Sequence, residues 1–246
     1  MRYHSAIPAV GILALVFTTA VKADDADQAR AIVDKAIKAM GGQEKLAKFK
    51  TQTWQMKGTY YGMGGDGLPF TANYAVSLPD KFRFEVHGFM IVVLNGDQGW
   101  RQMNGETQEF TKEEMASEKD NMHGNWVTTL IPLKDKSYTL MLLGESKVDD
   151  KPAVGVKVSR EGHPDVKLYF DKENSLLVKS ETKVKSAEQG GQEVNQETLY
   201  GNYQQVEGAW MAGKLTLLRD GKKFVEGENS DWKPADKLDD KTFSKP

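Results

Sequence analysis

The sequence contains no cysteine among its 246 residues. This absence excludes disulfide bonds, thiolate zinc sites, iron–sulfur clusters, thiol catalysis and attachment of a lipid through a cysteine. The sequence also lacks a large net charge, because its 33 Lys and Arg residues are balanced by 35 Asp and Glu residues. A chain without a basic excess is not expected to bind nucleic acid. With 39% hydrophobic and 28% charged residues, the composition is that of a folded globular protein.

The first 23 residues have the pattern of a secretory signal peptide. Arg2 precedes an uncharged, largely apolar stretch over residues 6–21, and Ala23 is a small residue of the kind that signal peptidases accept. The alternative is an N-terminal membrane anchor, but the stretch is shorter than the about 20 residues that a spanning helix needs. We predict cleavage after Ala23 and a mature periplasmic protein of residues 24–246, folded as a single domain.

Apolar residues in the first part of the mature chain follow the period of a helix. They recur at spacings of three and four, which predicts an amphipathic helix over 26–40. Gly41 and Gly42 are typical of a helix end, and a short helical segment is expected at 43–48. The apolar stripe consists of Ala29, Ile32, Val33, Ala36, Ile37 and Met40.

After residue 50 the apolar period changes from about 3.6 to 2, which is typical of antiparallel strands with one apolar face. The first strands are expected at 53–60, 70–78 and 81–86, and one of their faces carries Trp54, Met56, Tyr60, Phe70, Tyr74, Val76, Phe82, Phe84 and Val86. Further strands are expected at 89–94, 99–103, 153–159, 166–170, 176–184, 197–206, 209–218 and 224–230. The sequence therefore predicts ten or eleven strands.

The segment 111–143 interrupts this alternation. Thr111 and Glu114 have the spacing of a capping box, which marks a helix start. The apolar residues that follow do not alternate, and Pro132 interrupts or starts a helix. We expect two short helices and a connector here, with Trp126, Leu130 and Ile131 among the buried residues.

The number of elements constrains the architecture. A sheet of ten or eleven strands is roughly 50 Å wide, since neighbouring strands lie about 4.8 Å apart. Two or three helices, each about 10 Å across, cannot cover such a sheet while it is flat. We therefore predict an α+β, mostly β fold, an unclosed antiparallel β-barrel with a helical lid or plug. The pattern leaves open whether the inward aromatic residues form a packed core or line a cavity.

Motifs for catalysis and for metal binding are not found. The histidines of the mature chain, His87, His123 and His163, are far apart in sequence, and no HExxH motif occurs. The glycine-rich segment 62–67 lacks the lysine of a phosphate-binding loop, and no serine lies in a GxSxG motif. We predict no catalytic residues, no metal and no cofactor, and we expect that the protein is not an enzyme.

The order of elements resembles that of the LolA/LolB-type lipoprotein-carrier superfamily, in which a signal peptide, a helix, strands, central helices and a second run of strands follow one another. The end of the chain is similar to the closing pattern of outer-membrane lipoprotein-sorting proteins. The residues that carry this similarity are Gly208-Ala209-Trp210-Met211, Asp220-Gly221, and Leu238-Asp239-Asp240-Lys241-Thr242-Phe243 before Pro246.

This resemblance implies a carrier or binder of lipid or lipoprotein acyl chains, held in a hydrophobic cavity whose wall is the aromatic face listed above. It also implies a lid, formed by Ile32, Val33, Ile37, Met40, Trp126, Leu130 and Ile131. Arg83 is not assigned the lid-tethering role of the family's arginine, because its alternation points it outward. Without a cysteine the product is expected to be a soluble shuttle or sensor and not a membrane-anchored acceptor. We also expect a monomer, with envelope membrane proteins as further partners. The alternative is an envelope sensor or regulatory module on the same fold that binds a partner protein.

Overall fold

The computed structural model describes residues 23–186 and 190–246. The predicted signal peptide, apart from Ala23, lies outside the described residues. Helix α1 (Ala23–Ala39) carries Asp24 and Asp25 in its first turn, where acidic side chains complement the helix dipole. It begins three residues earlier than predicted, and no helix in the described ranges is long and apolar enough to cross a membrane.

Two glycines end α1 as the sequence predicts. The amide of Gly42 donates to the carbonyl of Ile37 (2.8 Å), and Gly41 has a positive φ of 116°. A Cβ at Gly41 would lie 2.4 Å from the Gly208 carbonyl oxygen, so only glycine fits this close approach. The short helices α2 (Gln43–Ala47) and η1 (Lys48–Lys50) follow and lead into the sheet.

One antiparallel sheet contains all thirteen strands. Its spatial order is β6-β5-β4-β3-β2-β1-β13-β12-β11-β10-β9-β8-β7, so two meanders meet where β1 pairs with β13. The strands are β1 (Thr51–Tyr60), β2 (Leu68–Ser77), β3 (Lys81–Val86), β4 (Met90–Asn95), β5 (Gln98–Met103), β6 (Glu106–Glu109), β7 (Thr139–Val148), β8 (Lys151–Ser159), β9 (Val166–Asp171), β10 (Leu177–Ser186), β11 (Gln192–Val206), β12 (Ala209–Arg219) and β13 (Lys222–Pro234).

The predicted count of ten or eleven strands is wrong, because β6 and β7 were not expected. β6 has only four residues, and in the sequence it resembles the end of a hairpin more than a strand. β7 contains the continuous apolar run 140–143, which lacks the alternation of a half-buried strand. A bulge between Leu142 and Gly144 in the pairing with β8 disturbs the period further.

The segment before β7 also differs from the prediction of two short helices. A single helix, α3 (Lys112–Thr128), begins at the predicted capping box, in which Thr111 and Glu114 exchange hydrogen bonds of 2.9 and 3.2 Å. A short 3-10 turn, η2 (Ile131–Lys134), follows. At 1.5 Å per residue α3 is about 25 Å long, which lets the chain cross from the β6 edge to the β7 edge.

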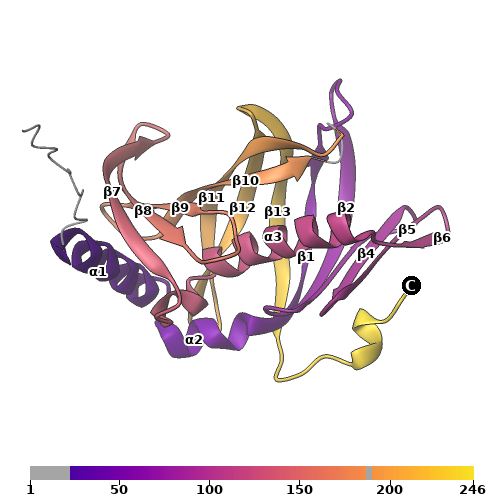
Figure 1. Ribbon diagram of the computed structural model, residues 1–246, viewed down its shortest axis with the longest axis horizontal. Helices are drawn as coiled ribbons and strands as arrows, with labels where there is room; N and C mark the ends of the chain where they lie inside the picture. Colours follow the sequence, from indigo (N-terminus) through magenta and orange to yellow (C-terminus); the bar gives the residue numbers. More distant parts are fainter. Residues whose placement is uncertain (1–22, 187–189) are drawn as a thin grey trace, which may run out of the picture.

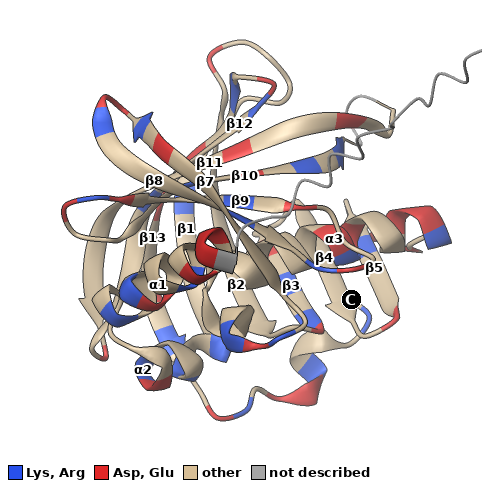
Figure 2. Ribbon diagram, turned by 60° about the vertical axis from the view of Figure 1, so that its left-hand side comes forward, with Lys and Arg blue, Asp and Glu red and all other residues tan. Residues whose placement is uncertain are grey.

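The sheet is curved and not closed, as predicted for an unclosed, mostly β fold. α3 runs across its concave face, while α1 and α2 lie toward the β7 end (Figure 1). Lysines and arginines are interspersed with aspartates and glutamates over the strands and helices, without a single basic face (Figure 2).

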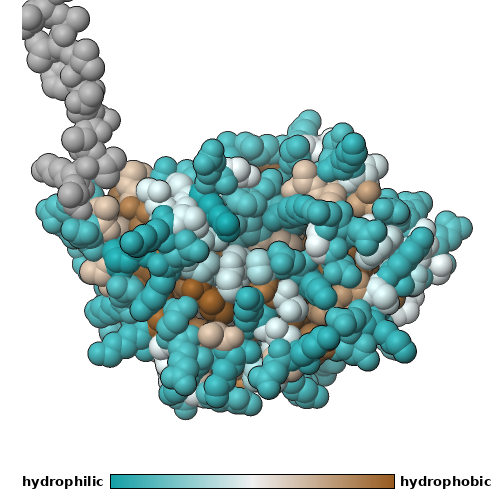
Figure 3. Space-filling view, turned by 60° about the horizontal axis from the view of Figure 1, so that its bottom comes forward, coloured by the Kyte–Doolittle hydropathy of each residue, from teal (hydrophilic) through white to brown (hydrophobic). Residues whose placement is uncertain are grey.

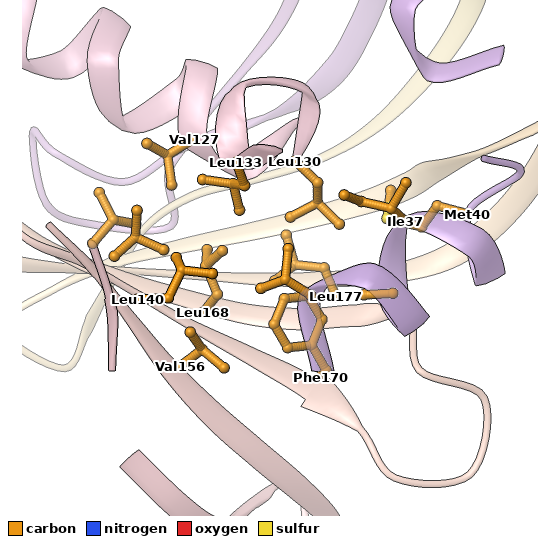
Figure 4. Close-up of a cluster of buried hydrophobic side chains, with 14 of the residues drawn as sticks. Ile37, Met40, Val127, Leu130, Leu133, Leu140, Val156, Leu168, Phe170 and Leu177 are labelled. Carbon is orange, nitrogen blue, oxygen red and sulfur yellow. The ribbon is translucent and has the colours of Figure 1, made fainter. Parts of the chain in front are cut away.

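The largest cluster of buried side chains lies between α1, η2 and strands β7 to β10. Ile37 and Met40 of α1 face Leu130 and Leu133, and Phe170 lies beneath them on the sheet (Figure 4). This cluster holds α1, the C-terminal end of α3 and η2 against the second meander.

The convex face of the first meander is covered by the end of the chain. Asp239 caps η4 (Asp240–Phe243) by accepting a hydrogen bond from the Lys241 amide (2.9 Å). Phe243, only 1% exposed, packs with Val93 and Trp100 on the outer side of the sheet. The closing sequence pattern is therefore explained by packing of the fold.

Candidate functional site

The aromatic residues predicted to share one face lie in a row across β1, β2 and β3. Trp54 pairs with Tyr74 in register, and their rings stack at 4.6 Å. Tyr74 pairs in turn with Phe84, at 5.0 Å between ring centroids. By strand register the same face also carries Met56, Tyr60, Phe70, Val76, Phe82 and Val86. Burial raises the pKa of the Tyr74 hydroxyl.

Helix α3 covers part of this row. Met115, Met122 and Trp126 of α3 form a buried cluster with Val76 and Leu94. Trp54 and Phe82, both partly buried, pack against that cluster. The protein's own side chains therefore fill the space between α3 and the first meander in this conformation.

Arg83 lies on the opposite, convex face, as its alternation predicts. It pairs in register with Ala75 and Val93, which pack under Phe243, and it forms an ion pair with Glu85 at 2.6 Å. A polar hollow of about 350 Å³ opens beside it on the outside of the sheet. Arg83 is therefore remote from the lid.

Two cavities lie at the second meander, beside and below α3. The first, here called the polar cavity, has a volume of about 230 Å³ and is lined among others by Glu118, Asn121, Asn125, Ser180, Thr198 and Arg219. The second, the apolar cavity, has about 140 Å³ and is lined among others by Met40, Leu46, Phe49, Leu177, Trp210 and Met211. Trp210 remains 37% exposed, so the apolar cavity reaches the surface near α2, where Figure 3 shows a hydrophobic area within hydrophilic surroundings.

Thr128 of α3 and Tyr200 of β11 line both cavities and separate them. The Tyr200 hydroxyl is within 2.9 Å of the Ser180 hydroxyl, and burial raises the pKa of Tyr200. Nearby, the Tyr203 hydroxyl donates to the Leu177 carbonyl at 2.5 Å, and burial raises its pKa as well. These neutral hydroxyls form a hydrogen-bonded partition between a polar and an apolar compartment.

The predicted lid residues lie in and next to three elements, α1, α3 and η2. Val33 and Ile37 of α1 and Met40, which follows the helix, project into the large core cluster, against which Ile32 packs from its edge. Leu130 and Ile131 join the same cluster, whereas Trp126 belongs to the cluster beneath α3. The Arg30 guanidinium donates to the Leu133 carbonyl, and the Gln43 amide donates to the Ile131 carbonyl at 2.9 Å. These hydrogen bonds fix η2 to α1 and α2.

Helix α3 also makes polar contacts at its exposed side. Arg101 of β5 forms an ion pair with Glu114 at 2.9 Å, and Lys119 contacts Asp97. The hydrogen bond from the Thr111 backbone is the largest cause of a lowered Glu114 pKa. Exposed ion pairs of this kind contribute less than about 1 kcal/mol each, so the buried apolar side chains of α3 contribute most to its packing.

A second contact of α3 is a stack of rings. His123 lies against His163 at 3.9 Å and parallel to Tyr138 at 5.8 Å between centroids. Arg160 donates to the Tyr138 hydroxyl at 3.0 Å, and His163 lies 3.3 Å from Asp120. Burial, followed by the charges of His163 and Arg160, lowers the pKa of His123 to about 4.

Sequence reasoning missed the polar cavity and the ring stack. Both depend on residues that are distant in sequence, such as His123 and His163, and that only the topology brings together. The described residues contain no group of three or more side chains that could hold a metal ion. The arrangement provides hollows, hydroxyl groups and a helix that covers the concave face, which suit binding.

No family model and no curated protein matches the sequence. The structure is similar to a LolA superfamily protein from Nitrosomonas europaea, with a TM-score of 0.57 and 14% identity over 88% of this chain and 97% of that chain. It is also similar to an outer-membrane lipoprotein-sorting protein domain from Vibrio parahaemolyticus, with a TM-score of 0.53 and 12% identity over 86% and 97%. A DUF1329 family protein from Desulfovibrio piger gives a TM-score of 0.58 with 13% identity over 88% and 97%. The chain has a LolA-like fold.

Proposed function

We propose that this protein is an exported, periplasmic carrier of acyl chains of lipids or lipoproteins, and that it acts as a monomer formed by residues 24–246. The observation that supports this most is the apolar, aromatic concave face of an unclosed barrel, which one helix, α3, covers. The LolA-like fold of a lipoprotein-sorting domain is consistent with it. Transport of this kind needs a dry site and no catalytic group.

The size of the cavities indicates that α3 has to move. The apolar cavity, at about 140 Å³, is close to the about 150 Å³ that holds one benzene molecule. Each cavity is below the about 300 Å³ at which sites for drug-sized ligands begin. A chain of about 14 carbons therefore enters only if α3 leaves the aromatic row, and Trp54, Tyr74 and Phe84 then become its wall.

The free energy gained by burying the acyl chain is similar to the free energy lost by exposing the buried side chains of α3. This similarity makes the exchange of lid and guest reversible. Burial of about 14 carbons contributes roughly 10 kcal/mol, at about 0.8 kcal/mol per methylene. Exposure of Met115, Met122 and Trp126 costs about 5 to 9 kcal/mol, since each buried apolar side chain contributes about 1.5 to 3 kcal/mol. The guest is favoured by a small margin, so it can be taken up and released.

A disulfide that fixes α3 tests this proposal. A Cβ at Gly124 would lie 3.9 Å from Cγ2 of Thr182 on β10, so side chains at these two positions are in contact. We expect Gly124→Cys with Thr182→Cys to form a disulfide between α3 and the sheet on oxidation, which the loss of both free thiols checks. Because the chain has no other cysteine, the cross-link is unambiguous. We expect the oxidised variant to take up no fluorescent fatty acid, and the reduced variant to take it up.

The matched control is Lys183→Cys with Asn195→Cys, a directly paired position on β10 and β11 that does not involve α3. It should take up the fatty acid in both redox states. Equal uptake by the oxidised and reduced lid variants would contradict lid displacement. The carrier function itself would be refuted if no variant binds the fatty acid and organic extracts of the native protein contain no lipid by mass spectrometry.

A second candidate function is a sensor that binds an envelope protein. Exposed apolar side chains gather at one end of the first meander, where successive hairpins turn: Met63, Leu68, Phe89 and Met103. If this rim holds a partner, Phe89→Ser with Met103→Ser should lose an envelope protein that co-purifies with the wild type in mild detergent, while fatty-acid uptake is unchanged. Loss of uptake with no change in co-purification would contradict the sensor.

A further inference from the structure

The polar cavity contains hydrogen-bonding groups that an acyl chain does not need. Ser180 and Thr198 are buried polar residues on neighbouring strands β10 and β11, and Tyr200 adds a third hydroxyl. Asn121 and Asn125 line the cavity from α3. Buried polar groups cost free energy unless they have partners, so an interior of this kind is unfavourable for a site that holds hydrocarbon alone.

The concave face therefore changes its chemistry from one meander to the other. Across β1 to β3 it is aromatic, whereas across β10 to β12 the register places Ser180 beside Thr198 and Leu217. In the next row, Thr182 lies beside Gln196 and Arg219. α3 crosses both halves and packs over β9 and β10 (Figure 1). A guest beneath α3 meets an apolar half and a hydroxyl-rich half.

The charges of the polar cavity do not favour an anion. Arg219 contributes one guanidinium, which lies 3.8 Å from the Phe224 ring centroid and donates to the Gln196 side chain at 3.4 Å. Glu118 contributes a carboxyl group on the opposite side, from α3. Burial is the largest cause of a raised Glu118 pKa, with Arg101 and Arg219 acting in the opposite direction. A phosphate or carboxylate placed here would be attracted by the Arg219 guanidinium but repelled by the Glu118 carboxylate.

We propose that the polar cavity binds the uncharged, hydroxyl-bearing head group of an amphiphile, of the size of glycerol or of one sugar ring. This inference rests on the proposed carrier function, because the acyl chain of the same molecule lies on the aromatic row of β1 to β3. At about 230 Å³ the cavity exceeds the about 150 Å³ that encloses a six-membered carbon ring. Hydroxyl and amide side chains both donate and accept, as a polyol head group requires.

Four amphiphiles with the same decyl or decanoyl chain test this assignment: decyl glucoside, 1-decanoylglycerol, decyl phosphate and decanoate. Each competes with a fluorescent fatty acid for the full-length mature protein, below its critical micelle concentration. We expect the glucoside or the glycerol ester to bind about tenfold tighter than the two anions, since each net hydrogen bond corresponds to about fivefold in affinity. Which of the two binds tighter distinguishes a sugar from glycerol.

Equal affinities, or a preference for decyl phosphate or decanoate, would overturn the head-group assignment and leave the carrier function intact. If none of the four displaces the probe and the probe itself does not bind, the carrier function fails and this inference fails with it. The two failures are therefore distinguishable in one titration series.

Two kinds of variant test whether the polar cavity causes the preference for uncharged head groups. Ser180→Ala with Thr198→Val should bring the glucoside to the affinity of decanoate without changing decanoate binding. Thr216→Val, on the opposite face of β12 next to Leu217, is the matched control and should keep the wild-type preference. Glu118→Gln keeps the size of the side chain and should raise the affinity for the two anions, decyl phosphate and decanoate, severalfold, without changing that for the two uncharged amphiphiles. An unchanged preference in the first variant and unchanged phosphate binding in the last would refute the site.

Discussion

Acidification is expected to weaken the contact between α3 and the second meander through one histidine, His123. It is buried in a stack with His163 and Tyr138, with Arg160 and Asp120 adjacent. Its pKa is lowered to about 4 in the folded protein, against about 6.5 in an unfolded chain. The neutral ring therefore stabilises the fold fully above pH 6.5, and this contribution is lost as the pH falls from 6.5 toward 4.

The expected loss follows from the two pKa values. A difference of one pKa unit corresponds to about 1.4 kcal/mol, and at pH 4.5 most of the interval between the two values has been crossed. The contribution of His123 to the free energy of unfolding is then smaller by about 2 to 3 kcal/mol than at pH 7.5. Because His123 belongs to α3, the lid is expected to open before the sheet unfolds.

Urea denaturation at pH 7.5 and 4.5 measures this effect against His123→Phe, which keeps a ring in the stack but does not titrate. We expect the wild type to lose about 2 to 3 kcal/mol more than the variant, since all other titrations are common to both. His87→Phe is the control, because His87 is exposed, and it should behave as the wild type. A pH dependence of His123→Phe equal to that of the wild type would refute the reasoning.

Three further substitutions separate stability from binding. Phe243→Ala should lower the free energy of unfolding by about 3 to 5 kcal/mol, measured by urea denaturation, and leave fatty-acid affinity unchanged, since Phe243 is buried on the convex face. Gly41→Ala should destabilise more than Gly42→Ala in the same assay, because both have a positive φ but only Gly41 contacts the Gly208 carbonyl closely. Trp126→Ala should lower stability yet raise fatty-acid affinity in a titration, because the lid gives up its main contact with the aromatic face. Weaker binding by Trp126→Ala would contradict competition between lid and guest.

The sequence predicts those parts of the fold in which the apolar period is undisturbed. Trp54, Tyr74 and Phe84 alternate strictly with polar residues, so their shared face could be predicted, and the stacked row agrees with it. Thr111 gave the correct start of α3, because a capping box is a local signal. The run 140–143 gave no such signal, since four consecutive apolar residues fit a buried helix as well as a strand.

The polar half of the interior was beyond prediction for a different reason. A bulge between Leu177 and Lys179 in the pairing of β10 with β9 shifts the alternation, so that Ser180 turns inward where the simple period would place it outward. Bulges are set by pairing with a neighbouring strand, which one sequence does not reveal. The ring stack of His123 and His163 likewise depends on how α3 lies over the β8–β9 turn.

In the proposed carrier, lid and guest compete for the same apolar side chains, and this competition determines how binding responds to substitutions. Contacts that hold α3 closed, such as the stack of His123 or the packing of Trp126, lower the apparent affinity for an acyl chain by the fraction of molecules that are open. The hydroxyl groups of Ser180 and Thr198 do not take part in this competition, because they belong to strands β10 and β11 and not to the lid. Lid changes should therefore alter affinity for all amphiphiles together, whereas changes on β10 and β11 should alter the preference among them.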